Sequence, residues 1–337
     1  MPEPIKATEG TSVTTTSGEA PERPRSPGPT RRRAAFGPTY GALVALVLLV
    51  ALNAAFTPNF ATASNLWNIL LQVATTVLVA VGMTLVIATG GIDLSVGSIM
   101  AVSSALAASL LDRGVGLAVA AGLVAGVAAG ALNGALVSVF RIQPFIVTLA
   151  LLITGRGVAQ VMSDGHLIPF SNATFEALGR GRIGPVPAQA LIMVLVVGAA
   201  LFAMRATSFG RYVVAVGGNE AAARLAGVPI YRTKITVYAL SGVLAGLAGL
   251  IDTARLGASD AAKVGLNIEL DAIAAVVVGG TPLTGGRATI TGTLIGALIM
   301  QVITTSFNMR LIPFSWSLVL KAAIILVAVT VQRPKTA

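Results

Sequence analysis

The stretch Thr89-Gly-Gly-Ile-Asp-Leu-Ser-Val-Gly-Ser98 lies at the centre of an almost wholly apolar run from Val73 to Leu111. A bilayer core of about 30 Å takes roughly 20 helical residues, so this run is too long for one membrane span and fits two. Its one charged residue, Asp93, would cost about 3 kcal/mol at the centre of a membrane helix, so we expect it where the backbone turns or where water reaches it. The glycines on either side of Asp93 allow the helix to open there. The stretch therefore predicts a broken or hairpin membrane element that lines a path.

The composition of the whole chain agrees with a membrane setting. Hydrophobic residues make up 55% of the 337 residues and charged residues 11%, with a mean hydropathy of +0.85, which exceeds what a soluble core requires. The chain has no cysteine and one histidine, His166, so neither thiol chemistry nor a metal-binding cluster is expected. The net charge of +10 would suggest nucleic acid in a soluble protein. Here the basic residues flank apolar spans, and we expect no nucleic acid partner.

The chain divides into three parts by composition. Residues 1–35 are rich in Pro, Ser, Thr and Glu and predict a disordered cytoplasmic tail, residues 36–333 a transmembrane domain, and residues 334–337 a cytoplasmic C-terminal tail. The arginines at 31–33 before the first apolar segment are also compatible with a signal peptide. We favour an uncleaved span, because residues 37–56 are longer than a usual signal core and residues 53–58 form a poor cleavage site.

Apolar runs predict an all-α bundle of about ten transmembrane helices, with broken or half-helices near 90–98 and 268–287. The runs are 37–56, 67–88, 96–111, 114–140, 142–162, 188–204, 235–254, 268–278, 288–307 and 314–331. The eighth is short enough to be a half-helix. Basic residues concentrate on one side, above all in the loop 205–234, so the positive-inside rule predicts a multi-pass protein with both termini in the cytoplasm.

Two glycine patterns bear on how the spans pack. Glycines recur every fourth residue from Gly122 to Gly134, which predicts a helix face for close packing. The segment Gly90–Gly97 also resembles Gly279–Gly286, and both are predicted on the same membrane side. A duplicated unit and chance similarity in a glycine-rich chain both remain open as explanations.

The basic loop after the sixth span contains the signals of a short helix. Asn219 is a good N-cap, Glu220 stands in the first turn, and Gly227 followed by Pro229 ends the element. Glu220 and Arg224 have the i,i+4 spacing of a favourable ion pair. Either a plain connector or a docking element for a partner would fit this pattern.

Three long motifs in order resemble the ribose-type permeases of bacterial sugar ABC importers: Gly90–Ser98, Val216–Gly227 and Glu269–Arg287. The resemblance runs from Tyr40 to Arg333. It implies a permease subunit, without enzymatic activity, that forms the inner-membrane path for a monosaccharide such as ribose or a related pentose or hexose. It also implies three partners: a periplasmic sugar-binding protein, a cytoplasmic ABC ATPase and a second permease copy. The chain contains no P-loop motif, so ATP and Mg are expected on the partner ATPase.

The resemblance assigns the residues of the basic loop to ATPase coupling. These residues are Gly217, Gly218, Asn219, Glu220, Ala221, Ala222, Arg224 and Gly227. Their spacing departs by one residue from the Glu-Ala-Ala-x-x-x-Gly signature of the broader importer group. A glycine-rich turn is expected on the same cytoplasmic side, with Gly279, Gly280, Thr281, Gly285 and Gly286.

A conduit for sugars needs scattered hydrogen-bonding groups of modest affinity. The candidates in or beside spans are Asp93, Ser95, Asn133, Gln143, Gln160, Gln301 and Asn308. Hydrogen bonding between helices is the competing role for each of them. Asn267, Glu269 and Asp271, at the predicted outer end of the eighth span, either meet the binding protein or cap a half-helix.

An ion-coupled secondary transporter is the alternative, with Asp93, Asp252 and Lys321 as candidate coupling residues. The scarcity of such residues and the capped cytoplasmic helix count against it.

Overall fold

The computed structural model describes residues 38–332. The tails predicted at 1–35 and 334–337 lie outside the described residues and remain predictions. The helices are α1 (Pro38–Phe56), α2 (Ala63–Ala88), α3 (Val96–Leu110), the 3₁₀ turn η1 (Leu111–Arg113), α4 (Val115–Ser138), α5 (Pro144–Met162), α6 (Ala173–Arg180), α7 (Ala188–Ala206), α8 (Ser208–Gly218), α9 (Glu220–Leu225), α10 (Ile230–Leu256), α11 (Ile268–Val278), α12 (Ile290–Met309) and α13 (Phe314–Gln332). Two antiparallel pairs of two-residue strands complete the described part: β1 (Ile168–Pro169) with β4 (Ala258–Ser259), and β2 (Arg182–Ile183) with β3 (Val186–Pro187). The all-α prediction is confirmed.

Eight of the described helices are long and apolar enough to cross a membrane. They are α1, α2, α3, α4, α5, α7, α10 and α12. The two other predicted spans are also helical: α13 carries a shorter apolar window, and α11 has 11 residues. Because 11 helical residues extend only about 16 Å, α11 is a half-helix, as the sequence predicts.

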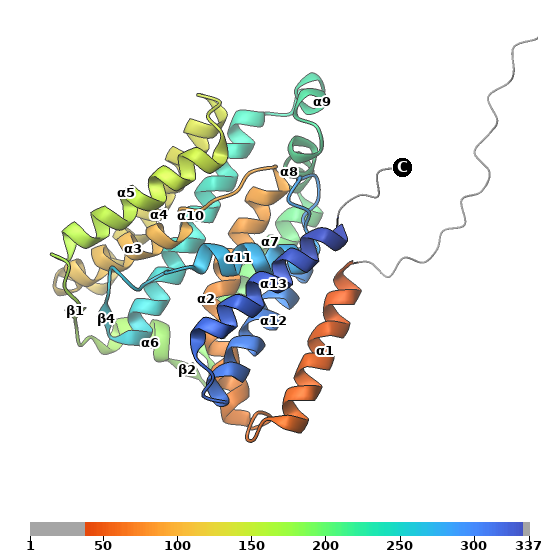
Figure 1. Ribbon diagram of the computed structural model, residues 1–337. Coiled ribbons are helices and arrows are strands. Elements are labelled where there is room, and N and C mark those ends of the chain that lie inside the picture. Colours follow the sequence, from red (N-terminus) through yellow and green to blue (C-terminus); the bar gives the residue numbers. More distant parts are fainter. Residues whose placement is uncertain (1–37, 333–337) are drawn as a thin grey trace, which may run out of the picture. The chain divides into compact units, whose positions relative to one another are not determined.

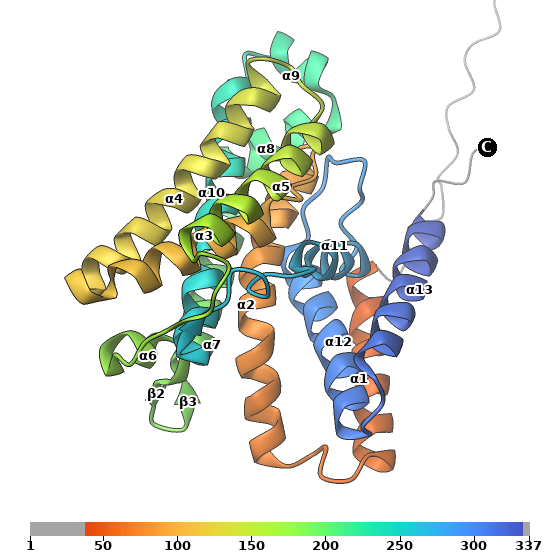
Figure 2. The same cartoon turned by 60° about the vertical axis from the view of Figure 1, so that its left-hand side comes forward.

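The connections between the long helices lie on two opposite sides of the bundle (Figures 1 and 2). One side, here called the α9 side, carries α9 and the connections 139–143 and 279–289. The opposite side, the α6 side, carries α6 and the connection 57–62. The basic residues predicted to be cytoplasmic therefore gather on the α9 side, because the loops at Arg141 and Arg287 lie there with α9.

The basic segment predicted as a loop over 205–234 is mostly helical, and this prediction was wrong in detail. It contains α8 and α9, and α10 begins at Ile230 rather than near Ile235. Arginines and lysines interrupt an apolar run without interrupting a helix, since both are good helix formers. The polar stretch 163–187 likewise contains α6 and three of the short strands.

The helix break predicted around Asp93 is present. Helix α2 ends at Ala88, Gly90 has a φ of +81°, and α3 begins at Val96. The amide of Gly91 donates a hydrogen bond of 3.1 Å to the carbonyl oxygen of Val86, in the last turn of α2. A left-handed conformation is favourable only for glycine-like residues, so Gly90 fixes the direction in which the chain leaves the helix.

The glycine face of α4 packs against α10. Gly126 contacts the carbonyl of Gly242 so closely that an added Cβ would overlap it, and Gly130 contacts the carbonyl of Tyr238 in the same way. The same arrangement joins Gly292 of α12 to Gly279 at the end of α11. In lipid no hydrophobic force holds helices together, so they associate through close backbone packing. Glycines at these positions allow that packing because they have no side chain.

The helices pack as two corresponding sets, α2–α5 and α10–α13. Helix α10 packs against α3 and α4 of the first set, and α2 packs against α11 and α12 of the second. Since α2 runs towards the α9 side and α10 runs away from it, the sets have inverted directions (Figure 1). The turn after α2 then corresponds to residues 257–267. The glycine segments Gly90–Gly97 and Gly279–Gly286 share one side but occupy different places in the two sets, so their similarity is not that of a duplicated unit.

Candidate coupling surface and buried polar cluster

The short helix predicted on the α9 side is formed as the sequence indicates. Asn219 Oδ1 accepts a hydrogen bond of 3.0 Å from the amide of Ala222 and caps α9. Gly227 has a φ of +77° and ends the element. Leu225, the last residue of α9, is 90% exposed. The helix therefore stands free of the bundle on all but one face, with an apolar side chain offered to solvent.

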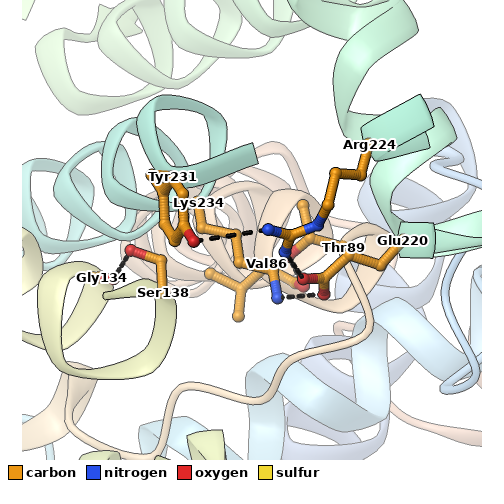
Figure 3. A network of polar contacts seen from close by, with 8 residues as sticks. All are labelled: Val86, Thr89, Gly134, Ser138, Glu220, Arg224, Tyr231 and Lys234. Carbon is orange, nitrogen blue, oxygen red and sulfur yellow. Dashed lines mark hydrogen bonds and ion pairs between the residues drawn. The ribbon is translucent and has the colours of Figure 1, made fainter. Parts of the chain in front are cut away.

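Glu220 connects α9 to α10 through an ion pair with Lys234 (Figure 3). Its carboxylate accepts from Arg224 Nη2 at 3.3 Å and from Lys234 Nζ at 2.6 Å. The hydrogen bond from Lys234 holds the pKa of the Glu220 carboxyl below its usual value, with a further contribution from Arg224. Arg224 also lies over the ring of Tyr231, 5.7 Å from its centroid. The i,i+4 pair was predicted, whereas the contact with Lys234 needed the tertiary structure.

The last residues of α8 pack on the end of α2. Gly217 contacts the carbonyl oxygen of Ala88 without room for a Cβ, and the same oxygen accepts a hydrogen bond of 3.0 Å from the amide of Gly286. A Cβ on Gly285 would lie 2.9 Å from Gly90 N. The three sequence motifs, far apart in the chain, thus meet at one point on the α9 side.

The glycine-rich turn has its own internal bonds. Thr289 Oγ1 lies 2.7 Å from Thr281 Oγ1 and donates to the carbonyl of Gly279 at 3.1 Å. The amide of Thr289 donates to Thr281 Oγ1 at 3.0 Å. Because these bonds close the turn on itself, Gly285 and Gly286 are presented to the ends of α2 and α8 as a fixed unit.

Three of the predicted path residues form one buried cluster, with no measurable exposure of Asp93. Ser95 Oγ and Ser241 Oγ donate to the two oxygens of Asp93 at 2.6 and 2.9 Å. Asn133 Nδ2 donates to Ser95 Oγ at 2.9 Å. Tyr238 Oη, also buried, has no hydrogen-bond partner within the described part of the chain. The cluster ties the turn after α2 to α4 and α10, and in this conformation it is sealed from solvent.

The four other predicted path residues lie apart from this cluster. Gln143 is exposed at the start of α5, Gln160 is exposed on α5, and Asn308 is exposed near the end of α12. Gln301 Nε2 donates to Gln72 Oε1 at 3.1 Å between α12 and α2. The structure of one copy does not gather the seven residues into a single site.

The residues considered for ion coupling also lie apart from one another. Lys321 on α13 pairs with Asp271 on α11 at 2.8 Å, and Asp252 pairs with Arg255 along α10 at 2.8 Å. Asp93 belongs to the sealed cluster. No shared ion site joins them among the described residues, and no group of three or more His, Cys, Asp or Glu side chains there is suited to a metal ion.

Arg156 is not among the predicted site residues, because it lies within the apolar run 142–162. It lies on α5, and its Nη1 donates to the carbonyl oxygens of Ala261 and Val264 at 2.9 and 2.7 Å. An arginine within an otherwise apolar membrane run is itself a signal for function, since such a charge is costly to place there.

Comparison with known proteins identifies the family of this fold. The sequence profile of the family described as "Branched-chain amino acid transport system / permease component" matches residues 65–329. The chain is 45% identical over 299 residues to the ribose import permease protein of Escherichia coli strain K12, covering 87% of this chain and 93% of the relative. The chain belongs to the ribose-type permease family.

Other relatives agree with this membership. The ribose import permease protein of Bacillus subtilis strain 168 is 44% identical over 306 residues, covering 90% of this chain and 94% of the relative. The L-arabinose ABC transporter permease protein of Azospirillum brasilense is 39% identical over 293 residues, with 86% of each chain covered. No solved structure matches the chain. The protein is thus a multi-pass membrane permease and a transport component, which removes the support for the ion-coupled alternative.

Proposed function

We propose that this chain is the inner-membrane permease of an ABC importer for ribose or a closely related monosaccharide. The substrate class is supported by the names of the relatives, two of which are ribose import permeases. The sugar would arrive on a periplasmic binding protein at the α6 side, and both chain termini would lie in the cytoplasm. The distribution of basic residues supports this orientation, because the α9 side carries the basic loops.

The α9 side is the proposed contact with a separate ABC ATPase. The observation that carries this assignment is the packing of Gly217 and Gly286 on the Ala88 carbonyl, because it connects the exposed helix α9 with the turn that leads to Asp93. A displacement of α8 and α9 by the partner would be transmitted to α2 through backbone contacts that leave no space between them. ATP and Mg would be bound by that partner.

A second copy of the chain is proposed to complete the path. Helix α11 packs mainly against α2, α12 and α13, and α5 covers little of its other side. Three polar path candidates, Gln143, Gln160 and Asn308, are exposed in the single copy. Pairing of two copies would give these groups a common water-filled space.

The proposed function is tested by purifying the tagged chain from mildly solubilised native membranes and identifying its partners by mass spectrometry. Recovery of a P-loop ATPase and a sugar-binding protein is the expected result. Glu220→Lys places like charges beside Arg224 and Lys234, so it should lower ATPase recovery several-fold. A chain that is repeatedly recovered alone, and that supports uptake driven by an ion gradient, would refute the proposal.

A further inference from the structure

Arg156 and Glu269 form a charged group beside the half-helix α11. Arg156 donates to the carbonyls of Ala261 and Val264, in the turn that leads into α11. Glu269 stands in the first turn of α11 and interacts electrostatically with Arg156. Its Oε2 lies 2.7 Å from the place of an added Cβ on Gly97, in the first turn of α3. The group therefore occupies the point where the beginnings of α3 and α11 meet.

This point lies deep in the membrane domain. The C-terminal end of α11 leads into the glycine-rich turn on the α9 side, and the helix extends only about 16 Å from there. Figure 1 shows α11 at mid-height, between the two sides that carry the loops. Its first turn therefore cannot reach the opposite surface of a core about 30 Å thick.

The polar groups at this depth are partly open to the surroundings of the single copy. Arg156 and Glu269 are half-buried and Asn267 is exposed. Gln160 is also exposed, and its i,i+4 spacing from Arg156 places both on one face of α5. Charged side chains at bilayer depth face water or protein rather than lipid. This face of α5 and α11 consequently borders water or protein rather than lipid.

We propose that Arg156, Glu269, Asn267 and Gln160 form the hydroxyl-binding site of the translocation path. The inference rests on the proposed sugar transport and names the groups that contact its substrate. The ligand class is a neutral polyhydroxylated molecule, because a carboxylate accepts hydrogen bonds from hydroxyls while a guanidinium and two amides donate to them. The half-helix supplies this site at the meeting point of the two inverted helix sets, where binding sites of transporters typically lie.

The neighbouring ion pair has a different role. Lys321 is only 7% exposed and binds both oxygens of Asp271, at 2.8 and 3.1 Å. This closed pair holds α11 against α13, whereas the Arg156 group stays open. The sealed cluster at Asp93 likewise offers nothing to a solute in this conformation.

The absence of cysteine from the chain gives a direct test. Asn267→Cys and Gln160→Cys are made singly, with Leu195→Cys on α7, which is 73% exposed and apolar, as the control for a side chain facing lipid. The complete complex in proteoliposomes is treated with a hydrophilic methanethiosulfonate, with and without bound nucleotide. We expect labelling at 267 and 160, little labelling at 195, and several-fold slower labelling when ribose is present at a saturating concentration.

Failure of both cysteines at 267 and 160 to react in either nucleotide state would overturn the proposal, as would labelling that ribose does not slow. Uptake is measured in parallel for Glu269→Gln and for Glu176→Gln, a control on the α6 side. Uptake by Glu269→Gln should fall at least tenfold with an altered ratio between ribose and arabinose, and unchanged uptake would contradict the assignment. Absence of sugar uptake by the unmodified complex would instead contradict the proposed function, while labelling still reports whether the face borders water.

Discussion

The amide of Gly286 donates a hydrogen bond of 3.0 Å to the carbonyl oxygen of Ala88, although nearly 200 residues separate them. That oxygen has no partner within its own helix, because it belongs to the last turn of α2. The glycine-rich turn thus completes the end of a helix from the other half of the chain. Gly217 contacts the same oxygen from α8, so a single backbone group joins the ends of α2 and α8 to the glycine-rich turn on the α9 side.

Gly217→Val is expected to block uptake by forcing the end of α8 away from the end of α2. The new side chain would overlap the Ala88 carbonyl, and overpacking of this kind costs about 1–3 kcal/mol. The measurement is sugar uptake by reconstituted complex, together with the thermal unfolding midpoint. Gly198→Ala on α7 is the control, since no atom lies within 4 Å of its added Cβ. Equal uptake by both variants would contradict the role of the Gly217 contact.

Gly227→Val should disturb the end of α9 and separate ATP hydrolysis from uptake. The φ of +77° at Gly227 is strained for a β-branched residue and costs about 1–2 kcal/mol. Asn tolerates this conformation better, so Gly227→Asn should retain most of the coupling. Sugar molecules transported per ATP hydrolysed is the quantity to compare, and parental coupling in the valine variant would refute the prediction.

Ser241→Ala removes a donor to the buried Asp93 carboxylate at 2.9 Å. A lost hydrogen bond to a buried polar group costs about 1–3 kcal/mol, so the unfolding midpoint of the detergent-solubilised protein should fall. Tyr238→Phe is the comparison, because its hydroxyl has no partner among the described residues. It should change the midpoint little. A larger loss for the tyrosine variant would show that its hydroxyl has an important partner.

Lys321→Met should destabilise the protein by about 1–3 kcal/mol, because the carboxylate of Asp271, which is 30% exposed, would lose its cation. Adding Asp271→Leu removes the unpaired charge and should recover much of that stability. Thermal unfolding of the two single variants and the double variant gives the coupling energy. Additive losses in the double variant would mean that the pair makes no joint contribution.

The Glu220 pair should stabilise the protein at neutral pH and lose its effect in acid. The pKa of this carboxyl is lowered from 4.5 in the folded state. Its contribution is therefore present above that value and disappears as the pH falls through the folded pKa. Because the side chain is 44% exposed, the contribution is about 0.5 kcal/mol or less. The difference in unfolding midpoint between the parent and Glu220→Gln should shrink below about pH 4.5, and a difference that grows in acid would contradict the assignment.

Much of the architecture was predictable because its causes are local. The length of apolar runs predicted the membrane helices, and the glycines around Asp93 predicted the break between α2 and α3. The capping residues predicted the position of α9, because Asn219 and Gly227 lie within one turn of its two ends. Each of these features depends on residues within a few positions in the chain.

The candidate site was predictable only in part, because its contacts join distant segments. The sequence predicted both Asp93 and Gln301 as path residues, with nothing to tell their roles apart. The tertiary structure shows that Asp93 lies in a sealed cluster and that Gln301 forms a hydrogen bond between two helices. The directions of the helices likewise show that the segments Gly90–Gly97 and Gly279–Gly286 lie side by side but do not occupy corresponding places in the two helix sets. The register of one helix against another depends on side-chain fit over the whole bundle.

The sequence by itself determined the membrane class, the positions of most helices, the family and the helix presented on the α9 side. The tertiary structure decided which motifs meet at the Ala88 carbonyl, and it brought Arg156 and Glu269 together at the half-helix. The physical reason is that backbone propensity and hydropathy act along the chain. Desolvation of a charge, by contrast, depends on which distant helix lies beside it.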